Sequence, residues 1–165
     1  EVWRWTDENK WAERLLEECL SRCPESKPGS PRDNVKEPIV FILEYLSGLE
    51  AAVYLLNGQV STFSFAADLK RKKEPVSFQF WFELEGTRAH FSGLVHHIEK
   101  MIITGIPSYP VERTLLTSGV LEALIDSNYQ GGRRLETPHL HVSYQPKKGP
   151  FYNPGKVLNE MQKKR

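Results

Sequence analysis

Residues 91–138 decide the fold, and they read FSGLVHHIEKMIITGIPSYPVERTLLTSGVLEALIDSNYQGGRRLETP. Apolar residues recur every three or four positions over 91–102, which predicts an amphipathic helix. A break with one glycine and two prolines follows, and a second, longer helix is expected over 111–129. Two glycines stop that helix, and the composition of 135–144 predicts a strand.

The residues before this stretch predict strands separated by turns. Asn57-Gly58 is the strongest hairpin signal, because both residues tolerate a positive φ, and it predicts that the second strand pairs with the third. Ser47-Gly48 predicts a tight turn between the first two strands. The expected strands are 39–46, 49–56, 59–69 and 76–84.

The N-terminal part predicts one helix and an exposed connection. Apolar spacing predicts a helix over 11–22, with Asp7 as its candidate N-cap and Pro24 beyond its end. Four prolines, one glycine and alternating charges over 24–38 indicate an exposed connection. We therefore expect, within a single domain overall, an N-terminal helix and proline-rich connection over 1–37, a sheet-and-helix domain over 38–146 and an irregular tail over 147–165.

The order of these elements predicts an α+β fold: an open, largely antiparallel β-sheet with helices packed on one face. Phenylalanines alternate with polar residues over 76–84, which predicts one buried and one wetter face. No second helical layer remains to cover the other side of this aromatic sheet, so we expect a homodimer formed through it. Either Phe80 or Trp81 must lie on the outer face, and both are candidate interface residues.

Charge and composition narrow the class of protein. The formal net charge is +1, which provides no overall field for nucleic acid or anionic membrane. No apolar run approaches the roughly 18 residues needed to span a bilayer, and the polar residues at the start of the sequence predict no signal peptide there. Cys19 and Cys23 are four residues apart on the expected helix, and a reduced pair in a cytoplasmic protein is our interpretation.

Two polar pairs are candidates for binding or chemistry. His139 and His141 would project from one face of the expected strand, and would ligate a metal only with a third ligand from elsewhere. Glu112 and Arg113 begin the long helix, where they serve helix-start electrostatics, a substrate pocket or a subunit interface. Both pairs also fit an ordinary polar surface, so we assign no catalytic, cofactor-binding or metal residue.

The sequence lacks the common phosphate-binding and catalytic motifs. There is no G-x-G-x-x-G, G-x-x-x-x-G-K-[ST], G-x-S-x-G, H-E-x-x-H or C-x-x-C. We therefore expect this chain to show no catalysis by itself.

Three segments resemble the C-terminal domain of the Gfo/Idh/MocA oxidoreductase family. They are PIVFILEYLSGLEAAVYLLNG at 38–58, TGIPSYPVERTLLTSGVLEAL at 104–124 and GGRRLETPHLHVSY at 131–144. The resemblance extends from about Trp3 to Tyr144 and rests on the order and spacing of these segments.

The resemblance implies an N-terminal Rossmann domain that binds NAD(P), and hydride transfer on a sugar-like or other hydroxyl or carbonyl substrate. The family's glycine fingerprint and its E-K-P segment with the catalytic lysine are not in this chain, which begins with Glu rather than Met. We therefore expect a missing upstream Rossmann domain, and a substrate-side and dimerisation domain that is inactive alone and binds no cofactor itself. The alternative is a free-standing, non-catalytic interaction module that homodimerises through its open sheet face.

Overall fold

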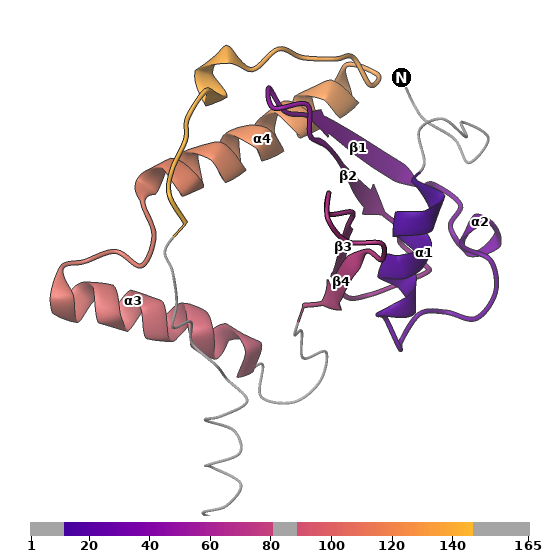
Figure 1. Cartoon of the computed structure of the whole chain (residues 1–165), viewed down its shortest axis with the longest axis horizontal. Helices are drawn as coiled ribbons and strands as arrows, with labels where there is room; N and C mark the ends of the chain where they lie inside the picture. Colours follow the sequence, from indigo (N-terminus) through magenta and orange to yellow (C-terminus); the bar gives the residue numbers. More distant parts are fainter. Residues whose placement is uncertain (1–11, 81–88, 147–165) are drawn as a thin grey trace, which may run out of the picture. The chain divides into compact units, whose positions relative to one another are not determined.

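The computed structural model describes residues 12–80 and 89–146, which divide into two compact units (Figure 1). Within the described residues, unit 1 comprises 12–80 and 126–134, and unit 2 comprises 89–125 and 135–146. The elements are α1 (Glu13–Ser21), α2 (Pro31–Asn34), β1 (Ile39–Glu44), β2 (Glu50–Leu55), β3 (Ser64–Ala67), β4 (Val76–Gln79), the 3-10 helix η2 (Ala89–Phe91), α3 (Ser92–Thr104), α4 (Val111–Tyr129) and the 3-10 helix η3 (Pro138–Leu140).

The α+β class with open antiparallel pairing is confirmed. The strands form two separate two-stranded sheets, β1 with β2 and β3 with β4, where the sequence suggested one continuous meander. The turn at Ser47-Gly48 joins β1 to β2 as predicted, with Tyr45 and Gly48 joined by a backbone hydrogen bond. The observed strands are shorter than the expected ones, and the predicted strand residues beyond 80 lie outside the described residues.

The predicted hairpin at Asn57-Gly58 is wrong, although a turn does form there. β2 pairs with β1 and not with β3, so this turn redirects the chain instead of joining paired strands. Gly58 has a φ of 99° and packs directly against the backbone of Asn34. The turn after β2 therefore packs against Asn34 in the proline-rich connection.

The core of unit 1 lies between α1, the connection and the β1–β2 sheet. Leu16, Val35 and Leu56 form its buried centre, surrounded by Leu20, Val40, Tyr54 and Val60. The predicted helix over 11–22 is confirmed as α1, and its predicted N-cap, Asp7, lies outside the described residues.

The buried side-chain amide of Gln59, which follows β2, forms hydrogen bonds with the proline-rich connection. Gln59 is 4% exposed, and its Nε2 donates to Ser26 Oγ and to the Lys27 carbonyl, both at 2.8 Å. Its Oε1 accepts from Asn34 Nδ2 at 2.8 Å, and its carbonyl accepts from the Lys27 N–H at 2.8 Å. Because buried polar groups are costly without partners, this set of bonds specifies one path for residues 26–34.

The two helices that the sequence predicts are α3, in unit 2, and α4, of which residues 111–125 belong to unit 2 and the last turn to unit 1. The C-cap of α3 is Gly105, whose left-handed φ of 67° lets its N–H reach the Met101 carbonyl. α4 covers Val111–Tyr129, as expected from the proline before it and the glycines after it. His97 Nδ1 hydrogen-bonds Ser108 Oγ at 2.8 Å, which ties α3 to the connection before α4.

The predicted strand over 135–144 is wrong. This segment contains the 3-10 helix η3 and otherwise no regular structure. Leu140 is buried against Gly119 of α4, where an added Cβ would lie only 2.4 Å from Leu140 Cδ2. Packing of one leucine onto a glycine of α4 therefore replaces the strand pairing that the residue pattern suggested.

Alanine at Gly58 should destabilise the protein more than alanine at Gly48. Both glycines have a positive φ, 99° and 79°, so each change costs about 1–2 kcal/mol of backbone strain. A Cβ at position 58 would also lie 2.9 Å from the Asn34 carbonyl oxygen, whereas at position 48 it meets no atom within 4 Å. Urea unfolding measures the loss in free energy of unfolding for each variant. Equal losses would show that the backbone at Asn34 moves aside at no cost in free energy.

Candidate functional site

The orientation of the β3–β4 sheet is set by polar contacts with α1. Ser77 of β4 donates to the Glu18 carboxylate, and Arg22 donates to Ser77 Oγ at 2.7 Å and to Glu18 at 2.9 Å. The hydrogen bond from Ser77, and then that from Arg22, lowers the pKa of Glu18 below its usual value. The ionised carboxylate is thus the form that this contact favours.

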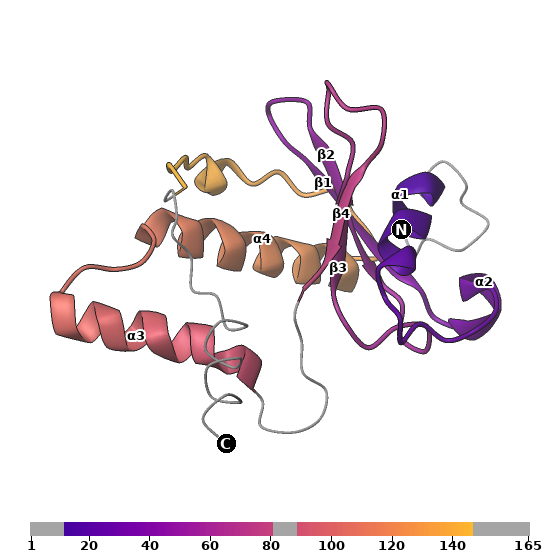
Figure 2. The ribbon, with the colours of Figure 1, turned by 60° about the horizontal axis from the view of Figure 1, so that its bottom comes forward.

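A second polar group lies on the same side of this sheet. Gln79 Nε2 donates to Thr62 Oγ1 at 2.9 Å and to Glu25 Oε2 at 3.1 Å, and the Thr62 hydroxyl donates to Glu25. Figure 2 shows α1 and α2 on this same side of the strands. The inner face of β3–β4 is therefore polar, because it meets the hydrogen-bonding groups of α1 and the residues that follow it.

The outer face of the β3–β4 sheet is aromatic. Phe65 and Phe78 are directly paired across the two strands, with ring centroids 5.2 Å apart, and Phe80 packs edge-on to Phe78 at 5.1 Å. Phe63 continues this face, because its carbonyl accepts from the Phe80 N–H at 2.8 Å. These four phenylalanines are 43–61% exposed.

The β1–β2 sheet also has an outer face made only of apolar side chains. Val40 and Tyr54 point into the unit 1 core, and the Tyr54 hydroxyl accepts from the Ala12 N–H at 3.0 Å. The alternate residues must lie on the other side of this sheet, and Val53 and Leu55 among them are 45% and 40% exposed. We call the two apolar faces together the sheet outer face, comprising Ile39, Phe41, Leu43, Ala51, Val53, Leu55, Phe63, Phe65, Phe78 and Phe80.

The structure therefore places Phe80, one of the two predicted interface residues, on an exposed apolar surface. The other, Trp81, lies outside the described residues. The sequence pattern over 76–84 suggested a buried apolar face and a wetter polar face, and for β4 this is wrong. The polar residues Ser77 and Gln79 are instead packed on α1 and its following segment. The i,i+4 pair Glu18 and Arg22 can be read from the sequence, but it gives no signal of the contact with Ser77.

Unit 2 has a second exposed apolar surface. Residues at three- and four-residue spacing on and beside α3 form one stripe and are 42–75% exposed. We call this the α3 stripe; it consists of Phe91, Leu94, Val95, Ile98, Met101 and Ile102. None of the helices in the described part of the chain is long and apolar enough to cross a membrane.

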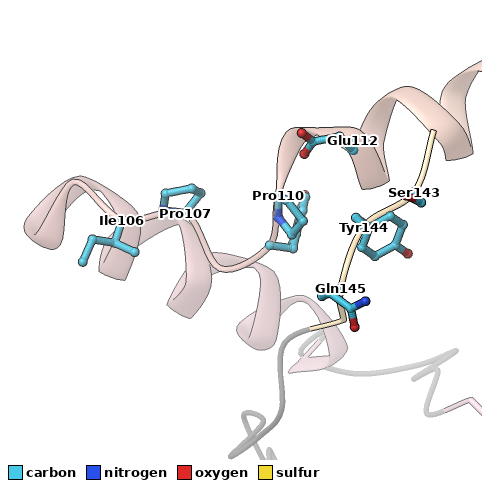
Figure 3. A pocket seen from close by; sticks show the side chains of 8 residues that line it. Ile106, Pro107, Pro110, Glu112, Ser143, Tyr144 and Gln145 are labelled. Atoms are coloured by element: carbon cyan, nitrogen blue, oxygen red, sulfur yellow. The ribbon is translucent and has the colours of Figure 1, made fainter.

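A shallow hollow of about 500 Å³ lies in unit 2 beside the start of α4. Figure 3 shows Pro110 and Glu112 beside it, together with Ser143 and Tyr144 from the segment after η3. Among the described residues that line it, Glu112 is acidic, and Ser143 and Gln145 add neutral polar groups. The described residues that line it are Ile106, Pro107, Tyr109, Pro110, Glu112, Ser143, Tyr144 and Gln145.

Glu112 and Arg113, the candidate pair at the start of α4, make different contacts. Glu112 lines the hollow, whereas the Arg113 guanidinium lies over the Tyr109 ring, 4.3 Å from its centroid. The negative face of an aromatic ring attracts a cation and holds it in place. The contact of Arg113 with Tyr109 therefore supports the part of the hollow that Tyr109 lines. The side chains around this hollow suit a small polar molecule with an apolar side.

The predicted shared face of His139 and His141 is not formed. His139 lies within η3 and His141 caps its end, so the two-residue alternation of a strand does not apply. Both side chains are exposed. Among the described residues, no three His, Cys, Asp or Glu side chains gather as a possible metal site.

Arg134 and the two cysteines have structural roles in unit 1. Arg134, after the two glycines, pairs with Glu44 at 2.9 Å and offsets the like charge of Glu50 directly opposite Glu44 across the sheet. Cys19 and Cys23 are free thiols, and burial raises the pKa of Cys19. A thiol with a raised pKa is a weak nucleophile at neutral pH, so Cys19 suits packing better than catalysis.

Comparison of the chain with protein-family models, with curated proteins and with solved structures gave no match.

Glutamine at Glu18 should remove an acid-sensitive part of the stability. The pKa of Glu18 is lower in the folded state, so its contribution is present above the unfolded-state pKa and is lost as the pH falls through the folded-state pKa. The stability gap between wild type and Glu18→Gln should therefore narrow from about pH 6 to about pH 3, a range that spans the usual Glu pKa of about 4.3. Urea midpoints across this range measure the gap, with Glu17→Gln at an exposed position of the same helix as control.

Proposed function

We propose that this chain is the substrate-side and dimerisation domain of a cytoplasmic Gfo/Idh/MocA-like oxidoreductase. Hydride transfer on a sugar-like or other hydroxyl or carbonyl substrate would then require NAD(P) bound by a Rossmann domain outside this chain. The observation that carries the assembly part of the proposal is the sheet outer face, on which each residue is apolar and six are at least 40% exposed.

The partner that best fits the sheet outer face is a second copy of this chain. A face without charged side chains can meet an identical face without like-charge repulsion, and a two-fold axis brings the same residues together. A partner with a charged surface would find no complementary group there. Exposed apolar patches of this kind mark association surfaces, because removing them from water is favourable.

The hollow beside α4 supports the substrate-side part of the proposal. Its tyrosines and prolines provide an apolar wall, and Glu112, Ser143 and Gln145 provide acceptors and donors for hydroxyl groups. We assign these residues to binding and orientation only. The sequence has none of the family's residues for proton or hydride chemistry, so the reacting centre would belong to the Rossmann side.

The alternative function is a free-standing, non-catalytic module that homodimerises through the same face. The mass of the native protein in its source cells, detected with an antibody against this chain, separates the two. A mass about twice that of the 19.0 kDa chain supports an additional domain and the oxidoreductase proposal. A mass equal to that of the chain supports the free-standing module and contradicts the oxidoreductase proposal.

Glutamate at Phe78 should convert the purified chain from dimer to monomer. Phe78 lies at the centre of the aromatic group and is 44% exposed, so a charge there would be desolvated by dimerisation. The matched change Ile102→Glu places the same charge on the α3 stripe, where Ile102 is 75% exposed, and should leave the dimer intact. Sedimentation velocity measures the mass of both variants.

The opposite pattern, with Ile102→Glu dissociating the dimer and Phe78→Glu not, would assign assembly to α3 and contradict the sheet-face proposal. A monomeric wild-type chain at high micromolar concentration would contradict it as well. Circular dichroism and urea unfolding identify a variant that has lost its fold. In that event Val53→Glu, on the β1–β2 part of the same face, provides the test, with monomer as the expected state.

The purified 165-residue chain should neither reduce NAD(P)+ with a sugar or cyclitol nor oxidise NAD(P)H with the corresponding carbonyl compound. The physical reason is that no glycine-rich loop at a helix start is present to hold a pyrophosphate. Absorbance at 340 nm follows the reaction, and isothermal titration calorimetry tests cofactor binding directly. Turnover above the rate without protein would show that the chain needs no Rossmann domain.

A further inference from the structure

The connection between β3 and β4 carries four consecutive basic residues, Lys70, Arg71, Lys72 and Lys73, which we call the basic tip. All four side chains are exposed. Of the 22 basic residues in the chain, 18 lie elsewhere, against 21 acidic residues, so the rest of the chain has a net charge of −3. The basic tip is therefore a local concentration of positive charge on a chain whose other residues sum to a net negative charge.

The backbone of this connection is held in place from α1. Arg14 Nη1 donates to Asp68 Oδ1 at 2.7 Å, and Arg14 Nη2 donates to the Lys73 carbonyl at 3.1 Å. The Lys72 N–H also donates to the Leu69 carbonyl at 2.9 Å, which closes the turn. Arg14 therefore binds the chain just before the basic tip and at the last residue of the tip. The four charged side chains of the tip remain exposed to solvent. Like charges at such close spacing repel, and a bound anion would relieve that repulsion.

We propose that the basic tip is a docking point for an acidic segment of a partner protein. A short run of Asp and Glu matches the length of a four-residue tip. Leu69 is 46% exposed beside the cations, and it offers an apolar contact that a peptide side chain can cover. Nucleic acid and anionic membrane extend far beyond the tip and would meet the net negative remainder of the chain.

This docking point is independent of the proposed dimer. The sheet outer face has no charged side chain, whereas binding at the basic tip depends on charge and is screened by salt. A protein with both surfaces can pair with its own copy and still recruit an acidic partner. Failure of one of the two proposals leaves the other unaffected, because their variants and readouts differ.

The test is a fluorescence anisotropy titration of the full chain with a labelled peptide of four glutamates, one leucine and four further glutamates. Saturable binding that weakens from 50 to 500 mM NaCl is expected. The double variant Lys70→Gln/Lys72→Gln should bind about tenfold more weakly, as two lost exposed ion pairs imply. The matched control Lys36→Gln/Lys100→Gln removes two exposed cations elsewhere and should bind as the wild type does.

Three results would overturn the proposal: no saturable binding, an equal loss in both double variants, or tighter binding to single-stranded RNA or to phosphatidylserine vesicles than to the peptide. The last result would identify a general polyanion or lipid surface. Urea unfolding confirms that each variant is folded. If Lys70→Gln/Lys72→Gln were unfolded, the single variant Arg71→Gln would replace it, with about threefold weaker binding expected.

Discussion

The hydrogen bonds among Glu18, Arg22 and Ser77 are the interaction on which the exposure of the aromatic β3–β4 face depends. They fix the polar side of β4 against α1. In a strand, neighbouring side chains alternate between faces, so this choice necessarily turns Phe78 and Phe80 outward. A carboxylate with a lowered pKa is well suited to the role, because it stays ionised and keeps both donors at neutral pH.

The distribution of apolar residues suits a protein that is completed by association. Among the described residues, the buried apolar side chains are few: Leu16, Cys23, Val35, Leu56 and Leu140. The sheet outer face and the α3 stripe leave much more apolar surface in contact with water. Burial of such surface is the main favourable contribution to folding and association, so a partner would add stability that the small core cannot supply.

The two surfaces proposed for association in unit 1 differ in their chemistry. The sheet outer face offers apolar contact, which salt affects little, whereas the basic tip between β3 and β4 offers a contact that salt weakens. Arg14, which holds the tip, lies on α1 with Glu18, and Glu18 and the C-cap residue Arg22 orient the β3–β4 sheet. One short helix therefore positions both surfaces, and this links the packing of unit 1 to its proposed partners.

Local chemistry in the sequence determined the α+β class, the helices of residues 91–129 and the turn at Ser47-Gly48, because caps, prolines and periodicity act over a few residues. The tertiary structure alone decided which strands pair, that 135–144 forms no strand, and that the aromatic side of β4 faces outward. The sequence identified Phe80 on an expected uncovered sheet face and Glu112 as a candidate, but not the other side chains of that face or the hollow beside Glu112. Partner choice depends on distant contacts, such as Leu140 against Gly119 and Ser77 against Glu18, which no local pattern encodes.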